Sequence, residues 1–344
     1  MMRLRLYPIL LVIISIAIYF IASSISLVNI KPIPYTTPRI CEKTSSDRQK
    51  KSAPEIVVYV PTPILWIERR HIVLEQFRRE LPLLHNAHLI FVLGTKQGPY
   101  LEEEAHGIAA ARREAAKEED FPRIRYLFTA CRDLGDEPHN PNGTSSTSCK
   151  VYEALRHIVA FYDAAPPRYV WRGADDAYLD LTVFSEHVAP VLQTCRLFMG
   201  RLRFPSPTTT GDYDLDLPSR HPELYALFGL NKFGKYMVGM GYCMSWDVAR
   251  FIGAASIPPR LTWCEDIMVS HWLLFYDVDF VDLNSAVPGV RMVHADEDKS
   301  FVSTWLSSNP THRVLLAHRM TQSQWGALAL RPLGDQSAFY LVAH

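Results

Sequence analysis

The chain has 344 residues, and its 36 lysine and arginine residues balance its 36 aspartate and glutamate residues, so the formal net charge at pH 7 is zero. This balance excludes the basic footprint with which most nucleic-acid-binding domains attract phosphate, so no nucleic-acid partner is expected. Hydrophobic residues make up 48% of the sequence, which is enough for one large globular domain beyond the N-terminal region.

The N-terminal region has the pattern of a membrane anchor. Residues 6–28 are almost wholly apolar, and a helix of that length spans the roughly 30 Å hydrocarbon core of a bilayer. Arg3 and Arg5 precede the apolar stretch, which predicts a cytoplasmic tail of residues 1–5 and a luminal remainder. The chain is therefore expected to be a single-pass type II membrane protein. The alternative is a cleaved signal peptide, whose apolar core is usually shorter.

The segment that follows indicates a stem and an oxidising compartment. Residues 29–54 are rich in Pro, Ser, Thr and Lys and cannot form a core. Six cysteines without zinc spacing favour disulfides of open connectivity: Cys41, Cys131, Cys149, Cys195, Cys243 and Cys264. The one acceptor sequon for N-glycosylation begins at Asn142, in a stretch whose composition predicts an exposed loop.

From residue 55 onward, strand and helix patterns alternate. Apolar runs predict strands at 56–60, 88–93, 123–128 and 168–171, and helical periodicity predicts helices at 66–81, 102–119 and 151–162. This alternation predicts an α/β fold with a mostly parallel central sheet flanked by helices.

The last of these strands is followed closely by two adjacent carboxylates, Asp175 and Asp176. Parallel sheets bind ligands at the carboxyl ends of their strands. Carboxylate oxygens at such an edge suit Mg²⁺ or Mn²⁺ carrying a nucleotide diphosphate. The competing interpretation is a solvated acidic turn.

Four motifs follow one another along the chain: Glu68–Val73, Arg172–Leu179, Gly239–Ser245 and Cys264–Val269. In this order they resemble the β1,3-galactosyltransferase-like family, glycosyltransferase family 31, a group of type II Golgi enzymes with a GT-A fold, which is Rossmann-like. The resemblance covers about residues 55–298. The run from Trp171 to Asp176 is similar to a protozoan branch of that family.

The chain departs from the family pattern at several positions. Arg172 stands for the Lys of the Lys-x-Asp-Asp-Asp-x-Phe-Val signature, and Ala174 stands for its first Asp. Leu74 and Phe77 replace an Arg and a Trp of the early segment. Lys150, by contrast, matches the family, which has a Lys ahead of the helix that leads to the metal strand.

The resemblance implies a role for each matching residue. The donor-binding residues would be Arg70, Arg172, Asp175, Gly239, Gly241 and Tyr242. The ligands of Mn²⁺ or Mg²⁺ would be Asp176, Asp175 and His294. Asp266 would be the catalytic base, and Glu265 would orient it or contact sugar hydroxyls, unless Glu265 only caps the helix that begins there.

The activity implied by the resemblance is an inverting, metal-dependent hexosyl transfer in the Golgi lumen. The donor would be UDP-galactose or UDP-N-acetylglucosamine, and the acceptor a glycan hydroxyl on a glycoprotein or glycolipid, with a β1,3-type linkage favoured. The catalytic domain would span residues 55–300, and residues 301–344 would form a C-terminal extension packed on it.

Two other classes of protein fit part of the sequence. A membrane-anchored glycan-binding relative would be inactive, with Ala174 as its lesion. A luminal glycoside hydrolase would use paired carboxylates as acid and base without a metal. Dependence on a metal and turnover of a sugar nucleotide distinguish these classes from the transferase.

Overall fold

The computed structural model describes ten segments: residues 53–80, 86–96, 101–118, 122–133, 146–192, 195–203, 235–255, 265–273, 276–294 and 313–319. The chain divides into two units, residues 1–44 and 45–344, and all described residues belong to the second. The predicted tail, the anchor at 6–28, most of the stem and the sequon at Asn142 lie outside the described residues. Within the described segments, no helix is long and apolar enough to span a membrane.

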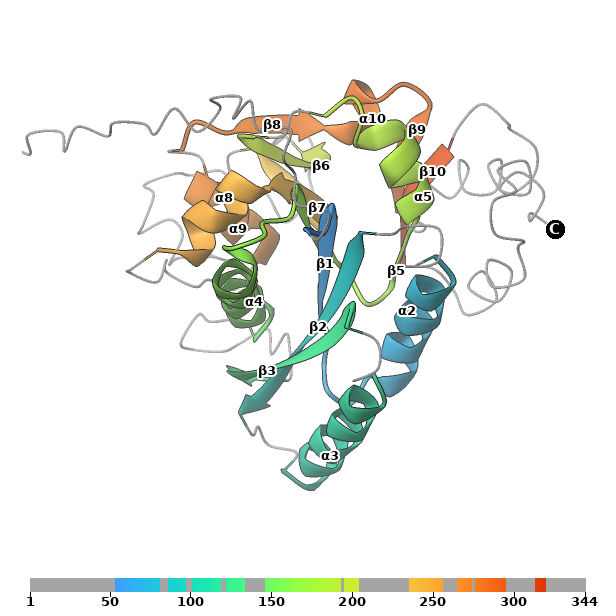
Figure 1. The fold of residues 1–344 in the computed structure, drawn as a ribbon, viewed down its shortest axis with the longest axis vertical. Coiled ribbons are helices and arrows are strands. Elements are labelled where there is room, and N and C mark those ends of the chain that lie inside the picture. The colour runs from blue at the N-terminus through green and yellow to red at the C-terminus, as the bar shows by residue number, and fades with distance from the viewer. Residues whose placement is uncertain are drawn as a thin grey trace, which may run out of the picture. The chain divides into compact units, whose positions relative to one another are not determined.

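A seven-stranded sheet, ordered β3-β2-β1-β4-β7-β6-β8, forms the centre of this unit (Figure 1). The strands are β1 (Ile56–Pro61), β2 (Ala87–Lys96), β3 (Ile124–Arg132), β4 (Tyr169–Gly173), β6 (Leu197–Arg203), β7 (Tyr236–Ser245) and β8 (Asp279–Asp282). Strands β3, β2, β1 and β4 pair in parallel, as do β6 and β8. Strand β7 is antiparallel to both β4 and β6. The predicted α/β class with a mostly parallel sheet is confirmed, whereas the antiparallel strand was not predicted.

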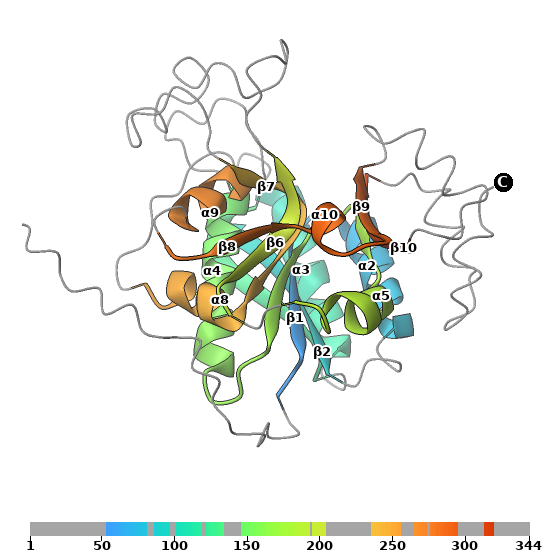
Figure 2. The same ribbon diagram turned by 90° about the horizontal axis from the view of Figure 1, so that it is seen from above.

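Helices cover both faces of the sheet (Figure 1 and Figure 2). One face carries α4 (Ser146–Tyr162), α8 (Trp246–Gly253) and α9 (Glu265–Leu273), and the other carries α2 (Ile67–Glu80), α5 (Leu181–Val183) and α10 (Leu283–Ala286). A π-helical segment, Phe184–Val188, continues α5, and α3 (Leu101–Lys117) contacts β3.

Strand β1 shows why two apolar layers form. All six of its residues are buried. Ile56, Val58 and Val60 belong to the core beneath α2, while Val57 and Tyr59 belong to the core beneath α4. Because successive side chains of a strand point to opposite faces, an unbroken apolar run supplies both cores at once.

A second sheet of three strands, ordered β5-β10-β9, lies beyond the end of β4. Its strands are β5 (Ala177–Leu179), β9 (Val290–His294) and β10 (Arg313–His318). Strand β10 is antiparallel to β5 and parallel to β9, with His318 opposite both Ala177 and His294. Residues beyond 300, expected to form an extension, thus contribute a strand directly beside the two aspartates.

The cysteines are only partly paired. Cys131 at the end of β3 and Cys149 in the first turn of α4 form a disulfide, and Cys195 is also disulfide-bonded. Cys243 of β7 is a free, buried thiol. The even cysteine count therefore does not translate into complete pairing.

A buried pair of carboxylates lies where α2 meets β5 and α5. Glu80 accepts hydrogen bonds from the Leu181 backbone N–H at 2.9 Å and from the Gln76 side chain at 3.1 Å. Asp180, also buried, accepts from the Val183 N–H at 2.7 Å and so caps α5. Burial, together with the negative charge of Asp180, raises the pKa of Glu80 to about 8.

This shift predicts that stability depends on pH through Glu80. Folding raises the pKa of Glu80 from 4.5 to about 8. The stability that protonated Glu80 contributes is therefore complete below pH 4.5 and is lost as the pH rises through about 8. Between about pH 5 and about pH 9, the free energy of unfolding should fall by about 4 kcal/mol, as measured by urea denaturation. Glu80→Gln should remove this decline.

The matched control is Glu75→Gln, which changes a largely exposed carboxylate on the same helix and should leave the decline in place. If Glu80→Gln and the unaltered protein lose stability equally over this pH range, the assignment to Glu80 is wrong.

Candidate active site

The carboxyl edge of the sheet gathers the two aspartates that follow β4. The Thr62 hydroxyl, just beyond β1, donates a hydrogen bond of 2.8 Å to Oδ2 of Asp175. His318 Nε2 lies 3.1 Å from Oδ1 of Asp176. The remaining oxygens face Arg69, whose Nη1 lies 3.7 Å from Asp175 Oδ1 and 4.0 Å from Asp176 Oδ2. The ring of Trp66 lies 4.0 Å from this guanidinium group.

The environments of the two aspartates differ. Burial raises the pKa of Asp175, and the hydrogen bond from Thr62 only partly offsets it. Burial also acts to raise the pKa of Asp176, but the bond with His318 and the nearby arginines outweigh it, so this pKa is lowered. Asp176 is therefore the more strongly ionised of the two and the stronger candidate for binding a cation.

His318 was not predicted from the sequence. It closes strand β10 opposite His294, and the two imidazole rings meet edge to face with 4.8 Å between their centroids. His294 thus lies in the neighbourhood of Asp176, as the motif analysis predicted, but His318 makes the direct contact. The continuous apolar run at residues 314–317 that forms most of β10 was the available signal, since it placed His318 at the end of a strand.

Nowhere in the described segments do three or more His, Cys, Asp or Glu side chains form a preassembled metal site. The carboxylate oxygens of Asp175 and Asp176 nevertheless suit Mg²⁺ or Mn²⁺, and His318 lies beside them. Mg²⁺ usually takes only one or two carboxylates and completes its coordination with phosphate oxygens and water. An open set of this kind is therefore suited to an ion that arrives with a diphosphate.

Arg70 and Arg69 are adjacent in sequence but lie in different environments. Arg70, predicted to bind the donor, is fully buried, and its Nη1 donates to the carbonyls of Pro63 and Ile64 at 2.8 and 2.9 Å. Its Nε also contacts Glu114 at 3.3 Å. This placement makes Arg70 a brace for the turn after β1, and Arg69 is the arginine that reaches the aspartates.

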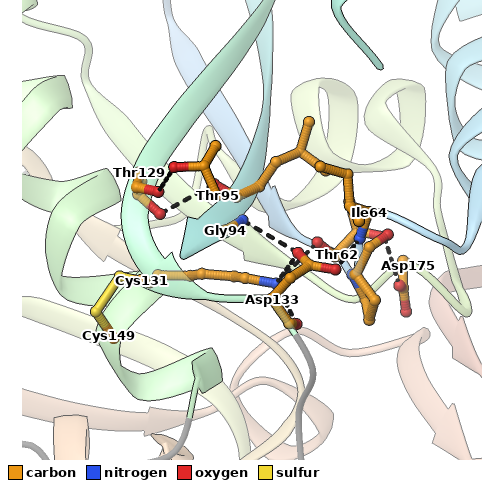
Figure 3. Close-up of polar contacts among 12 residues, drawn as sticks. Thr62, Ile64, Gly94, Thr95, Thr129, Cys131, Asp133, Cys149 and Asp175 are labelled. Atoms are coloured by element: carbon orange, nitrogen blue, oxygen red, sulfur yellow. Dashed lines mark hydrogen bonds and ion pairs between the residues drawn. A yellow bond between two sulfur atoms is a disulfide. The ribbon is translucent and has the colours of Figure 1, made fainter. Parts of the chain in front are cut away.

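A buried ion pair between Lys150 and Asp133 holds the ends of three parallel strands together. Figure 3 shows Asp133 at the centre of these contacts. Its carboxylate accepts hydrogen bonds from the backbone N–H groups of Ile64 and Gly94 and from Lys150 Nζ at 2.9 Å. Lys150 also donates to the carbonyl of Thr62 at 3.0 Å. The hydroxyl of Thr62 in turn donates to Asp175, so the ion pair indirectly holds this aspartate in place.

Removal of one partner should leave the other as an uncompensated buried charge. Lys150→Met should lower the free energy of unfolding by about 3–5 kcal/mol. Combining Lys150→Met with Asp133→Asn should cost clearly less than the sum of the two single changes, because no lone charge remains. Urea denaturation of the four proteins measures this coupling.

The matched control is the exposed pair of Arg156 and Glu153 on the same helix, 3.2 Å apart, whose coupling should be below about 0.5 kcal/mol. Additive effects of Lys150→Met and Asp133→Asn would contradict the assigned ion pair.

A second buried ion pair lies between β4 and α9. Arg172 Nη2 donates to Glu265 Oε2 at 3.1 Å, and Arg172 Nη1 donates to the carbonyl of Gly239. The Tyr242 hydroxyl donates to the other oxygen of Glu265. Arg172 Nε is buried and has no hydrogen-bond partner among the described residues. This N–H group is enclosed within the protein.

Asp266 lies in the first turn of α9, directly beside this ion pair. Its Oδ2 accepts from the Gly239 backbone N–H at 2.9 Å, and its Oδ1 accepts from its neighbour Ile267 at 2.9 Å. Burial raises the pKa of Asp266, although both N–H groups and the charge of Arg172 oppose the shift. A carboxylate with a raised pKa is suited to accepting a proton near neutral pH.

The glycines of β7 allow this close packing. A Cβ at position 239 would come within 3.1 Å of Asp266 Oδ2. Gly241 has φ of +153°, and a Cβ there would lie 2.7 Å from the side chain of Leu316 in β10. Position 241 therefore requires glycine, whereas a side chain at position 239 would make the Asp266 carboxylate shift.

The structure thus brings most of the predicted residues to one edge of the sheet. One group contains Asp175, Asp176, His294 and, newly, Arg69 and His318. The second contains Arg172, Gly239, Tyr242, Glu265 and Asp266. Arg172, which binds Gly239 and Glu265, lies on β4 three residues before Asp175, so the two groups are neighbours.

Neither a family model nor a curated protein sequence matches the chain. Solved structures do match at low similarity. A 4-diphosphocytidyl-2C-methyl-D-erythritol synthase is 11% identical, with 72% of this chain and 97% of that chain covered and a TM-score of 0.34. A glycosyltransferase involved in the glycosylation of the major capsid of PBCV-1 is 6% identical, with 81% and 100% covered and a TM-score of 0.35.

A glucosyl-3-phosphoglycerate synthase from Mycobacterium tuberculosis, in complex with phosphoglyceric acid, is 12% identical, with 85% of this chain and 81% of that chain covered and a TM-score of 0.33. Because the identities and TM-scores are this low, we base no functional assignment on these structures.

Proposed function

We propose that the protein is a GT-A glycosyltransferase that transfers a hexose from a nucleotide diphosphate sugar with inversion and releases the nucleotide diphosphate. The observation that carries the proposal is the presence of two distinct carboxylate groups at one sheet edge. Asp175 and Asp176 lie near the basic side chains of Arg69 and His318. Asp266 is partly buried and accepts a hydrogen bond from a backbone N–H. Inverting transfer needs one carboxylate to accept a proton and a separate positive centre for the leaving diphosphate.

Asp266 acts as the general base in this proposal. Its raised pKa gives the carboxylate enough basicity to take the proton of an acceptor hydroxyl as the hydroxyl oxygen attacks the anomeric carbon. Gly239 fixes one carboxylate oxygen through its N–H group. The neighbouring carboxylate on α9, Glu265, is a poorer candidate for the base because both of its oxygens already accept hydrogen bonds from Arg172 and Tyr242.

The leaving diphosphate faces the other carboxylate group. A bound Mn²⁺ or Mg²⁺ would supply the Lewis acidity that neutralises charge on the departing phosphate. Asp176, Asp175 and His318 would hold the ion, and the ring of His294 packs against that of His318. Arg69, whose side chain is 45% exposed, would bind phosphate oxygens directly, which replaces the role first predicted for Arg70.

The finer assignments are proposals that depend on the sequence motifs. These are membership of glycosyltransferase family 31, UDP-galactose or UDP-N-acetylglucosamine as donor, a β1,3-type linkage, a glycan acceptor, and a type II orientation in the Golgi membrane. Glycosylation at Asn142 belongs to the same proposal.

Ala174, the main departure from the family signature, is compatible with activity. Its side chain is buried and belongs to the apolar core. The absent carboxylate therefore lies at a position that faces the core, while both Asp175 and Asp176 are retained. This placement favours a transferase over an inactive relative.

The proposal predicts metal-dependent turnover of a sugar nucleotide by the full-length chain. One of the two labelled UDP-sugars should be consumed in the presence of Mn²⁺, and EDTA should abolish its consumption. Asp176→Asn and Asp266→Asn should each lower kcat by roughly a hundredfold or more, the first by loss of the cation site and the second by loss of the base.

The matched control is Asp163→Asn, which alters a largely exposed aspartate paired with Arg250 and should retain activity. Absence of turnover together with absence of metal-dependent UDP binding would contradict the transferase. Hydrolysis of glycosidic bonds that persists in EDTA would instead favour the hydrolase.

A further inference from the structure

Both carboxylate oxygens of Glu265 are hydrogen-bonded within the protein. Arg172 donates to Oε2 at 3.1 Å, the Tyr242 hydroxyl donates to Oε1, and the side chain is 6% exposed. A carboxylate held in this way is poorly placed to act as a second acid or to contact sugar hydroxyls. Its effect on catalysis must therefore pass through the groups that it binds.

A continuous series of contacts leads from Glu265 to Asp266, both on α9, through the two strands β4 and β7. Arg172, fixed by Glu265, donates to the carbonyl of Gly239, and the N–H of the same Gly239 residue donates to Asp266 Oδ2. Each of these contacts crosses between β4, β7 and α9. The orientation of the Asp266 carboxylate consequently depends on where Arg172 is held.

We propose that Glu265 is a positioning residue that acts through Arg172, fixing the Gly239 backbone and setting the positive charge that Asp266 experiences. This inference rests on the proposed function, in which Asp266 accepts the proton of the acceptor hydroxyl. It assigns to Glu265 two separable effects, one on geometry and one on charge.

The surroundings of Asp266 make the charge effect specific. The charged and titratable groups that face this end of α9 are Arg172 of β4, Tyr242 of β7 and Tyr59 of β1, with Glu265 on α9 itself. From α4, which also packs on α9, Tyr152 contacts Trp272 further along the helix. Arg172 is thus the cation that acts on Asp266, and Glu265 is its counter-ion.

The first test changes the charge of Glu265 and follows Asp266 without any substrate. Glu265→Gln leaves the positive charge of Arg172 uncompensated, so the pKa of Asp266, measured by carbon NMR of its carboxyl group, should fall by about one unit. The acidic limb of the pH profile of kcat/KM should move to lower pH by the same amount.

The second test separates charge from geometry. Glu265→Asp keeps the charge but shortens the side chain, so the acidic limb should stay in place while kcat falls about tenfold or more. Arg172→Gln combined with Glu265→Gln removes both charges, and such neutral replacements of a buried pair are often tolerated by the fold. The double variant should return the Asp266 titration toward that of the unaltered protein, with kcat still low.

The matched control is Glu55→Gln. It breaks a partly exposed ion pair with Arg168, 3.8 Å away, just before β4, the strand that carries Arg172. It should change neither the Asp266 titration nor the pH profile. If Glu265→Gln fails to fold, the double variant and Glu265→Asp provide the test.

The outcomes separate this inference from the proposed function. An Asp266 titration that Glu265→Gln leaves unchanged, or a double variant that titrates as the single one does, overturns the coupling even if the protein is an active transferase. A shifted titration in a protein without turnover supports the coupling and contradicts the proposed reaction. Equal activity of Glu265→Asp and the unaltered protein overturns the geometric effect.

Discussion

The burial of carboxylates at the carboxyl edge of the sheet is the constraint on which the rest of the structure depends. A carboxylate removed from water costs several kcal/mol unless a cation or several hydrogen-bond donors compensate it. Here Lys150 compensates Asp133, and Arg172 compensates Glu265. Because the four partners come from β3, β4, α4 and α9 or their ends, the interactions that satisfy these charges also fix the strand ends that carry the site.

The two ion pairs fix different parts of this edge. The Lys150–Asp133 pair, next to the Cys131–Cys149 disulfide, fixes the turn after β1. Thr62 of that turn then binds Asp175, one of the two candidate metal ligands. The Arg172 pair instead fixes the region around Gly239, where Asp266 is held. A first turn of α9 held by hydrogen bonds and an open pair of aspartates would suit the proposed transfer, in which the base is oriented while the diphosphate enters and leaves.

Much of the fold could be predicted from the sequence because its first half is regular. The apolar runs and helical periods between residues 56 and 171 matched the observed elements, although α4 begins at Ser146, earlier than expected. Strand β7 was not predicted as antiparallel, since pairing direction depends on distant partners. His318 was missed for the same reason: β10 reaches Asp176 only through pairing with β5 and β9. The choice of Arg70 over Arg69 was avoidable, because Val73, Leu74 and Phe77 are buried three, four and seven residues after Arg70, on its own face of α2.

The most direct measurement is a crystal structure of the protein with UDP and Mn²⁺, located by its anomalous signal. The account predicts Mn²⁺ about 2.2 Å from an Asp176 oxygen, bridged to the diphosphate, with His318 or His294 beside it and Arg69 turned from the aspartates toward phosphate. UDP bound away from the carboxyl edge of the sheet, or Mn²⁺ bound without Asp176, would contradict it.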